Sequence, residues 1–131
     1  MASNLELLRA LTERLTLGNL MAEGGVVISG DGRAFPLVGL LKDDKVAVLR
    51  TKMDPGMTVE SHNHPDSIEI LVVVGGALMV GLGSNNHSLT IGDSITLHPG
   101  DVHRAYTTGG ADLICITVPP ANEYPDVTDK Q

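Results

Sequence analysis

The segment GMTVESHNHPDSIEILVVVGG, residues 56–76, places three side chains of the kinds that bind metals directly before an aliphatic run. His62 and His64 are two residues apart, Glu69 follows five residues after His64, and the next five residues are all aliphatic. Alternate residues of an extended strand project from one face, so the two imidazoles can converge on a single ion. The Pro-Asp-Ser turn before Glu69 resets the strand phase, and we therefore expect the carboxylate to point to the same interior.

The rest of the chain consists mostly of short segments rich in β-branched residues, separated by Gly, Pro, Asn or Asp. We expect strands at 26–29, 34–41, 45–53, 68–74, 77–82, 88–90, 94–97 and 111–118. Short strands at this pace indicate an antiparallel sandwich or barrel.

The first residues have a different pattern. Ser3 and Glu6 resemble a capping box, and leucines recur after them at helical spacing, which predicts one N-terminal helix. We expect a helical extension over residues 1–22, a single barrel domain over 23–118 and an irregular tail over 119–131.

The amino-acid composition argues against nucleic acids and membranes as partners. Nine Lys and Arg against sixteen Asp and Glu give a net charge of −7, with no basic run, which argues against nucleic acid. The longest uncharged apolar run, Ile70–Leu82, is shorter than the roughly 20 residues of a membrane helix. The single cysteine, Cys115, cannot form an internal disulfide, and charges interrupt the N-terminal segment. We expect a cytoplasmic protein that does not enter a membrane.

A fourth histidine, His103, follows the turn Pro99-Gly100-Asp101, where a second sheet can present it across a barrel. With it, the pattern resembles the cupin superfamily. The first motif of that superfamily, Gly-x5-His-x-His-x3-4-Glu-x6-Gly, is matched in full by Gly56, His62, His64, Glu69 and Gly76.

The second cupin motif, Gly-x5-Pro-x-Gly-x2-His-x3-Asn, is matched in spacing by Gly92, Gly100 and His103. His98 stands in place of the proline and Thr107 in place of the asparagine. Neither position is a metal ligand in the family, so the departures affect the rim of the site rather than its ligands.

The resemblance implies an all-β fold, the cupin double-stranded β-helix or jelly-roll barrel, with one divalent metal per chain. The implied ligands are His62, His64, Glu69 and His103. Three imidazoles and one carboxylate suit Fe, Mn, Ni, Co, Cu or Zn, and they leave one or two coordination positions open.

Other polar residues are weaker candidates. His98 is a possible general base or substrate contact, or else a cap on a strand end, and Tyr106 either supports the site or coats its rim. These two are the catalytic candidates. Arg50 and Lys52 could project into the cavity and bind a carboxylate, whereas His87 lies in a hairpin that we expect to be exposed to solvent.

The ligand set is compatible with three kinds of function. The first is a metal-dependent enzyme acting on a small organic acid or carbonyl compound, with dioxygenase chemistry favoured. The second is an isomerase, lyase or decarboxylase in which the metal acts as a Lewis acid. The third is a module that binds or senses a small ligand without turnover.

The aliphatic strand also bears on assembly. If Glu69, Leu71 and Val73 face the cavity, their neighbours at 68, 70, 72 and 74 form a second apolar face. A strand that is apolar on both faces is normally covered on both. We therefore expect a homodimer, with the N-terminal helix as an alternative source of part of that cover.

Overall fold

The computed structural model describes residues 26–28, 34–42 and 44–122. Within these ranges all regular structure is β, and the strands are β1 (Val26–Ile28), β2 (Ala34–Lys42), β3 (Ala47–Met53), β4 (Thr58–His62), β5 (Ile68–Leu82), β6 (Asn85–Thr90), β7 (Ser94–Leu97), β8 (His103–Tyr106) and β9 (Ala111–Val118). The predicted all-β fold is confirmed. The helix expected over residues 1–22 lies outside the described residues, and the described part of the chain contains no helix that could cross a membrane.

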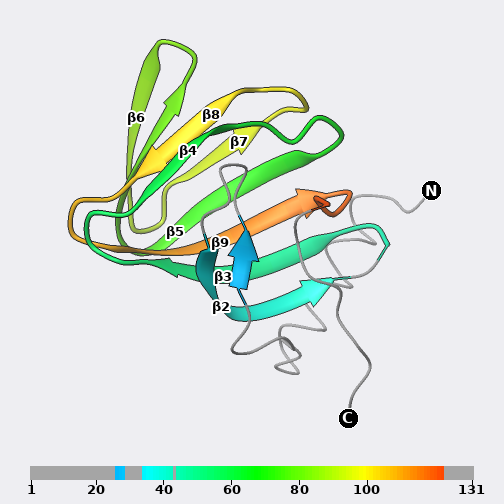
Figure 1. The fold of residues 1–131 in the computed structure, drawn as a ribbon, viewed down its shortest axis with the longest axis horizontal. Coiled ribbons are helices and arrows are strands. Elements are labelled where there is room, and N and C mark those ends of the chain that lie inside the picture. Colours follow the sequence, from blue (N-terminus) through cyan, green and yellow to red (C-terminus); the bar gives the residue numbers. More distant parts are fainter. Residues whose placement is uncertain (1–25, 29–33, 43, 123–131) are drawn as a thin grey trace.

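The long strand β5 organises the sheet, because four other strands pair with it. Its first half pairs with β7 and β9, and its second half pairs with β6 and β8, in every case antiparallel. The main path through the sheet is β1-β2-β3-β9-β5-β8-β4. In Figure 1 β5 passes between β4 and β8 on one side and β9, β3 and β2 on the other, so the sheet curls around an interior.

The Gly75-Gly76 pair does not end a strand, contrary to the sequence-based expectation of two strands. It lies inside β5, where the register against β9 shifts between Val73 and Gly75. Gly76 has φ of +69°, and a Cβ there would collide with the carbonyl of Gly110. Only glycine combines this backbone conformation with so close an approach. The pair therefore lets one strand change partners and serve both halves of the barrel.

The interior of the barrel is aliphatic. Along β9 the buried residues alternate with partly exposed ones, so that Leu113 and Cys115 face the interior. On β5, Leu71 and Val73 are buried beside Glu69, as the sequence predicts. Fully burying a side chain such as Val73 stabilises the fold by about 1.5 to 3 kcal/mol.

The opposite face of the same strands carries a second apolar surface. Val46 and Val48 are buried there and pack against Ile114, Ile116 and Val118. Arg50 and Lys52 follow Val48 at the same two-residue spacing and therefore share this outer face. The expectation that Arg50 and Lys52 project into the cavity is wrong, because the inward positions of β3 belong to its other residues.

Candidate metal centre

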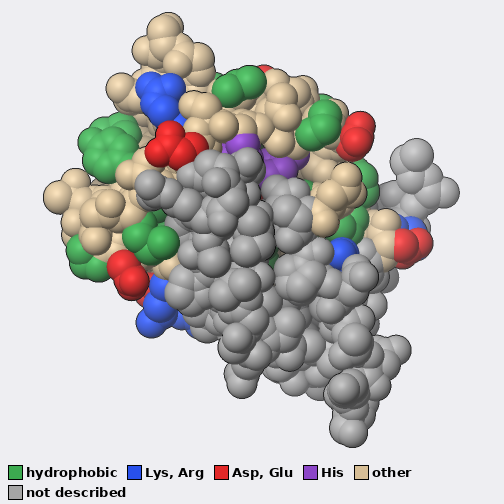
Figure 2. Space-filling model, in the orientation of Figure 1, with side chains coloured by type: hydrophobic (Ala, Val, Ile, Leu, Met, Phe, Trp, Pro, Cys, Tyr) green, Lys and Arg blue, Asp and Glu red, His purple; other side chains and the backbone are tan. Residues whose placement is uncertain are grey.

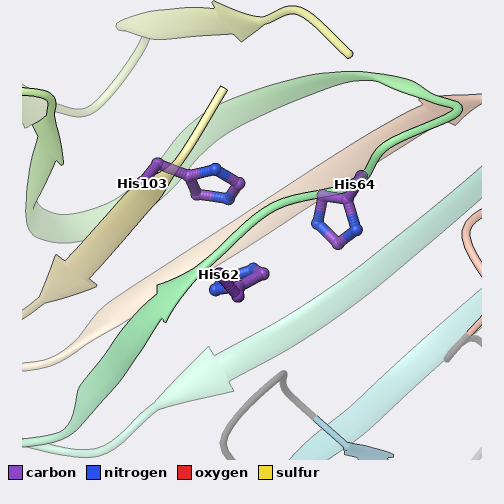
Figure 3. A group of neighbouring side chains, drawn as sticks. All are labelled: His62, His64 and His103. Carbon is purple, nitrogen blue, oxygen red and sulfur yellow. The ribbon is translucent and has the colours of Figure 1, made fainter. Parts of the chain in front are cut away.

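Three histidines come together at one end of the barrel. His62 ends β4, His64 lies in the segment that follows it, and His103 begins β8 as the cross-strand partner of His62. One ring nitrogen from each lies within 4.8 Å of the others. The ring centroids are 4.3 Å apart for His62 and His103, 5.0 Å for His62 and His64, and 5.5 Å for His64 and His103. Figure 3 shows the three rings gathered around a common space.

Backbone carbonyls fix the tautomer of two of these rings. Nδ1 of His62 lies 2.8 Å from the carbonyl oxygen of Glu60, and Nδ1 of His103 lies 3.0 Å from that of Asp101. A carbonyl oxygen only accepts, so each Nδ1 carries the hydrogen and donates it. In the neutral ring this leaves the lone pair on Nε2, the form in which imidazole binds a metal.

Glu69 is buried beside this cluster, with its Oε1 atom 3.3 Å from Nε2 of both His64 and His103. Burial alone would raise the pKa of Glu69, but hydrogen bonds from His103 and His64 and their charge outweigh it and lower the pKa to about 2. Glu69 therefore remains a carboxylate at all ordinary pH values.

Burial also affects His62, which is partly exposed at the edge of the cluster. Loss of hydration lowers the pKa of His62, and the neighbouring histidines add to this effect against the opposing hydrogen bond to Glu60. The imidazole is thus held neutral at physiological pH. A buried anion beside rings with free lone pairs is the donor chemistry that suits a divalent transition metal, and the site fits such an ion.

Hydrogen bonds to backbone carbonyls hold the loop of His64 in place. The carbonyl of His64 accepts from the backbone N–H of Gly100 at 3.2 Å, which ties it to the turn before His103. The Ser67 hydroxyl donates to the carbonyl of Pro119 at 2.7 Å, so the same loop is also tied to the end of β9. The two motifs of the sequence are therefore joined directly at their backbones.

Thr107 takes a definite structural role at the position where the cupin motif has asparagine. Its hydroxyl donates to the carbonyl of Ala77 at 2.7 Å and accepts from the N–H of Gly110 at 3.0 Å. A single hydroxyl thus joins β5 to the turn before β9. The departure from the motif leaves no unsatisfied group at this point.

Neither of the two catalytic candidates belongs to the three-histidine group. His98 is exposed beyond the end of β7, its N–H donates to the Asp101 carboxylate, and it is not part of the described imidazole group. Tyr106 is exposed on the face of β8 opposite His103, and it lines a separate cavity of about 160 Å³ with residues of β5 and β6. The geometry argues against a role for Tyr106 at the cluster. His87 is exposed on β6, as expected.

Part of the cluster is open to solvent. His62 is partly exposed, and Figure 2 shows histidine side chains at the surface in the upper part of the face in view. On its flank, His64 lines a small cavity of about 60 Å³ together with the loop 65–67 and residues 120–122. A molecule of a few non-hydrogen atoms can therefore approach this end of the barrel.

Comparisons with known proteins agree with this fold. A model of the Cupin domain family matches residues 49–119, more than half of the chain, and the protein belongs to that family. Two germin-like proteins of Arabidopsis thaliana, subfamily 1 members 7 and 3, are 42% and 40% identical over 57 and 58 residues. Each match covers 44% of this chain but only 25% of the relative's length.

Solved structures show the same fold at low sequence identity. KdgF from Halomonas sp. is similar with a TM-score of 0.61 and 22% identity, covering 68% of this chain and 80% of that one. A predicted oxalate decarboxylase from Thermotoga maritima gives a TM-score of 0.60 and 17% identity, covering 67% and 83%. These similarities establish the architecture and leave the reaction open.

Proposed function

We propose that the protein is a metal-dependent enzyme acting on a small organic acid or carbonyl compound, with dioxygenase chemistry. The observation that carries the proposal is the convergence of His62, His64 and His103 beside the buried carboxylate of Glu69. These four residues would hold one divalent transition metal. Such an ion, when bound, supplies Lewis acidity and a place for a chelating substrate and dioxygen.

The surroundings of the cluster favour this chemistry over an isomerase or lyase. Those reactions need a group that carries a proton to and from the substrate, which here would be His98, Tyr106 or a water bound to the metal. Within the described residues, His98 and Tyr106 were the candidates for that role, and neither joins the histidine group. The interior is lined by aliphatic residues such as Leu71 and Leu97, which exclude water and donate no protons.

A binding module is the second candidate, because it needs no proton carrier either. A solved structure with this fold, from Thermotoga maritima, is described as a predicted oxalate decarboxylase, which makes oxalate and other small dicarboxylates reasonable compounds for a screen. The small cavity beside His64, of about 60 Å³, is consistent with a ligand of this size.

The first experiment is elemental analysis of protein purified without an affinity metal column, followed by oxygen-uptake assays with small chelating acids. We expect about one transition metal per chain and oxygen consumption with at least one compound. His87→Ala, which changes an exposed histidine on β6, is the matched control and should behave like the unmodified protein.

The outcomes separate the candidate functions. Iron with oxygen uptake supports the dioxygenase. Zinc or nickel with turnover but no oxygen uptake identifies a lyase, isomerase or decarboxylase instead. Metal and ligand binding without turnover leaves the binding module, and protein that takes up no transition metal contradicts all three.

We also propose that the protein forms a homodimer through the outer face of β5 and β9. Cross-strand pairing places Ile116 beside Ile70 and Ile114 beside Val72, which makes one apolar strip, and Ile68 and Val74 are more than a third exposed. A second copy would cover this strip.

Light scattering at micromolar concentration tests the dimer. We expect about twice the chain mass of 13.8 kDa, and we expect Val72→Lys to give the single-chain mass because it places a charge in the strip. Ser88→Lys, on exposed β6, is the control and should remain dimeric. A mass near that of one chain for the unmodified protein would contradict the proposal.

A further inference from the structure

Thr117 on β9 has a buried hydroxyl that no packing argument explains. The side chain is fully buried, yet Oγ1 has no hydrogen-bond partner in the described part of the chain. Thr107, which is almost as deeply buried, both donates and accepts a hydrogen bond. An unpaired hydroxyl in an apolar interior costs stability, and valine would fill the same space without that cost.

The position of Thr117 points to the reason. It is the cross-strand partner of Glu69 on one side and of Ala47 on the other, and all three side chains are buried on the inner face. Directly opposed residues on one face have Cβ atoms about 4.5 to 5.5 Å apart. A change of χ1 between staggered rotamers is then enough to turn the hydroxyl toward the Glu69 side chain.

The Glu69 carboxylate requires hydrogen-bond donors, and the Thr117 hydroxyl can supply one. In the metal-free protein its Oε1 atom accepts from Nε2 of His64 and Nε2 of His103. Because Nδ1 of His103 is held by the Asp101 carbonyl, Nε2 is the atom of that ring left to bind a cation. Metal loading would therefore replace the N–H donors of the buried carboxylate with a bond from Glu69 to the ion, and the carboxylate oxygen that does not bind the ion would still need a hydrogen-bond donor.

We propose that Thr117 is a positioning residue for Glu69, whose hydroxyl donates a hydrogen bond to the Glu69 carboxylate when a divalent metal occupies the three-histidine cluster. This inference rests on the metal centre proposed above. It explains why the hydroxyl is present. The Thr117 hydroxyl destabilises the metal-free protein, where it is unpaired, and stabilises the metal-loaded protein, where it donates to Glu69. Outer hydrogen bonds to metal ligands of this kind typically change metal affinity by about 10- to 100-fold.

The test compares Thr117→Val, Thr117→Ser and Thr51→Val by titrating metal-free protein with Co²⁺ and following visible absorption. We expect Thr117→Val to bind Co²⁺ about 10- to 100-fold more weakly. Thr117→Ser keeps the hydroxyl and should remain within about threefold of the unmodified protein. Thr51 is buried on the same wall, opposite Leu113 rather than Glu69, so Thr51→Val should leave the affinity unchanged.

A second measurement distinguishes positioning from ordinary packing. Without metal, the thermal midpoint of Thr117→Val should equal or exceed that of the unmodified protein, because the substitution removes an unpaired hydroxyl. Unchanged Co²⁺ affinity in Thr117→Val, loss of affinity in Thr117→Ser, or a lowered midpoint in the metal-free Thr117→Val would each overturn the inference. Failure of the unmodified protein to bind Co²⁺ would instead overturn the metal centre itself.

Discussion

Replacing His64 with alanine should lower metal affinity by at least about 100-fold while leaving the strands folded. A four-ligand protein zinc site has an apparent binding free energy of about 10 to 16 kcal/mol, so one ligand in four carries about 3 kcal/mol. His64 lies in a loop, and alanine would lose the contact of its ring with Glu69 but retain the backbone carbonyl that accepts from Gly100. The aliphatic core does not include its side chain.

Metal content per chain and far-ultraviolet circular dichroism, measured on His64→Ala and His87→Ala together, check this prediction. His87→Ala should retain both full metal content and the β spectrum. If His64→Ala keeps its metal while His87→Ala loses it, the site is misplaced. If His64→Ala unfolds, the histidine supports the fold. The convergence of the histidines beside Glu69 would then no longer be evidence for an enzyme.

Acid should remove the metal between about pH 6 and pH 4, before the fold is lost. Protons compete with the metal for the imidazoles, whose ordinary pKa is 6.5, and each histidine that must lose a proton adds up to about a tenfold loss of affinity per pH unit. Three histidines together make the loss steep. The bound cation protects its own ligands, which places the end of the transition near pH 4.

Glu69 does not set this window, because its pKa of about 2 keeps it charged throughout. In the metal-free protein, the lowered pKa of Glu69 contributes stability that is complete above about pH 4.5 and is lost as the pH falls toward 2. The lowered pKa of His62 acts with the same sign, since its protonation below pH 6.5 favours the unfolded chain.

Metal content and circular dichroism of samples equilibrated at stepped pH separate the two processes. Metal should leave first and steeply, while the β spectrum persists. Retention of full metal content at pH 4 would show that the histidines are not the competing groups. A single transition in which metal and β structure are lost together would show that the fold depends on the metal.

The metal-ligand motif could be predicted from the sequence because its information is local. His62 and His64 are two residues apart, and the turn before Glu69 returns the carboxylate to the same side, so spacing alone indicates their convergence. The strands β4 and β8, which carry His62 and His103, were harder to predict from the sequence. β4 and β8 are short and polar on one face, so neither shows the aliphatic run by which the other strands are recognised.

The incorrect predictions for Arg50, Lys52 and Tyr106 had a common cause. Which side chains of a strand face the interior depends on the strands that pair with it, and the sequence does not give that pairing. Arg50 and Lys52 alternate with inward residues, and only the pairing of β3 with β9 shows which set faces the interior. Tyr106 is close to His103 in sequence but points to the other face of β8. Thr117 was missed because an unpaired hydroxyl is visible only when all possible partners have been placed. The cytoplasmic location and the domain boundaries remain predictions.

The pairing of His62 with His103 has a consequence for the order of folding. The chain between these cross-strand partners runs through β5, β6 and β7, so we expect the cluster to close after most of the barrel has formed. Contacts of such long sequence separation incur a loop-closure entropy that earlier local contacts must offset. Interactions made after the transition state slow unfolding without accelerating folding. A metal bound here would therefore lengthen the lifetime of the folded chain while leaving the time needed to reach it unchanged.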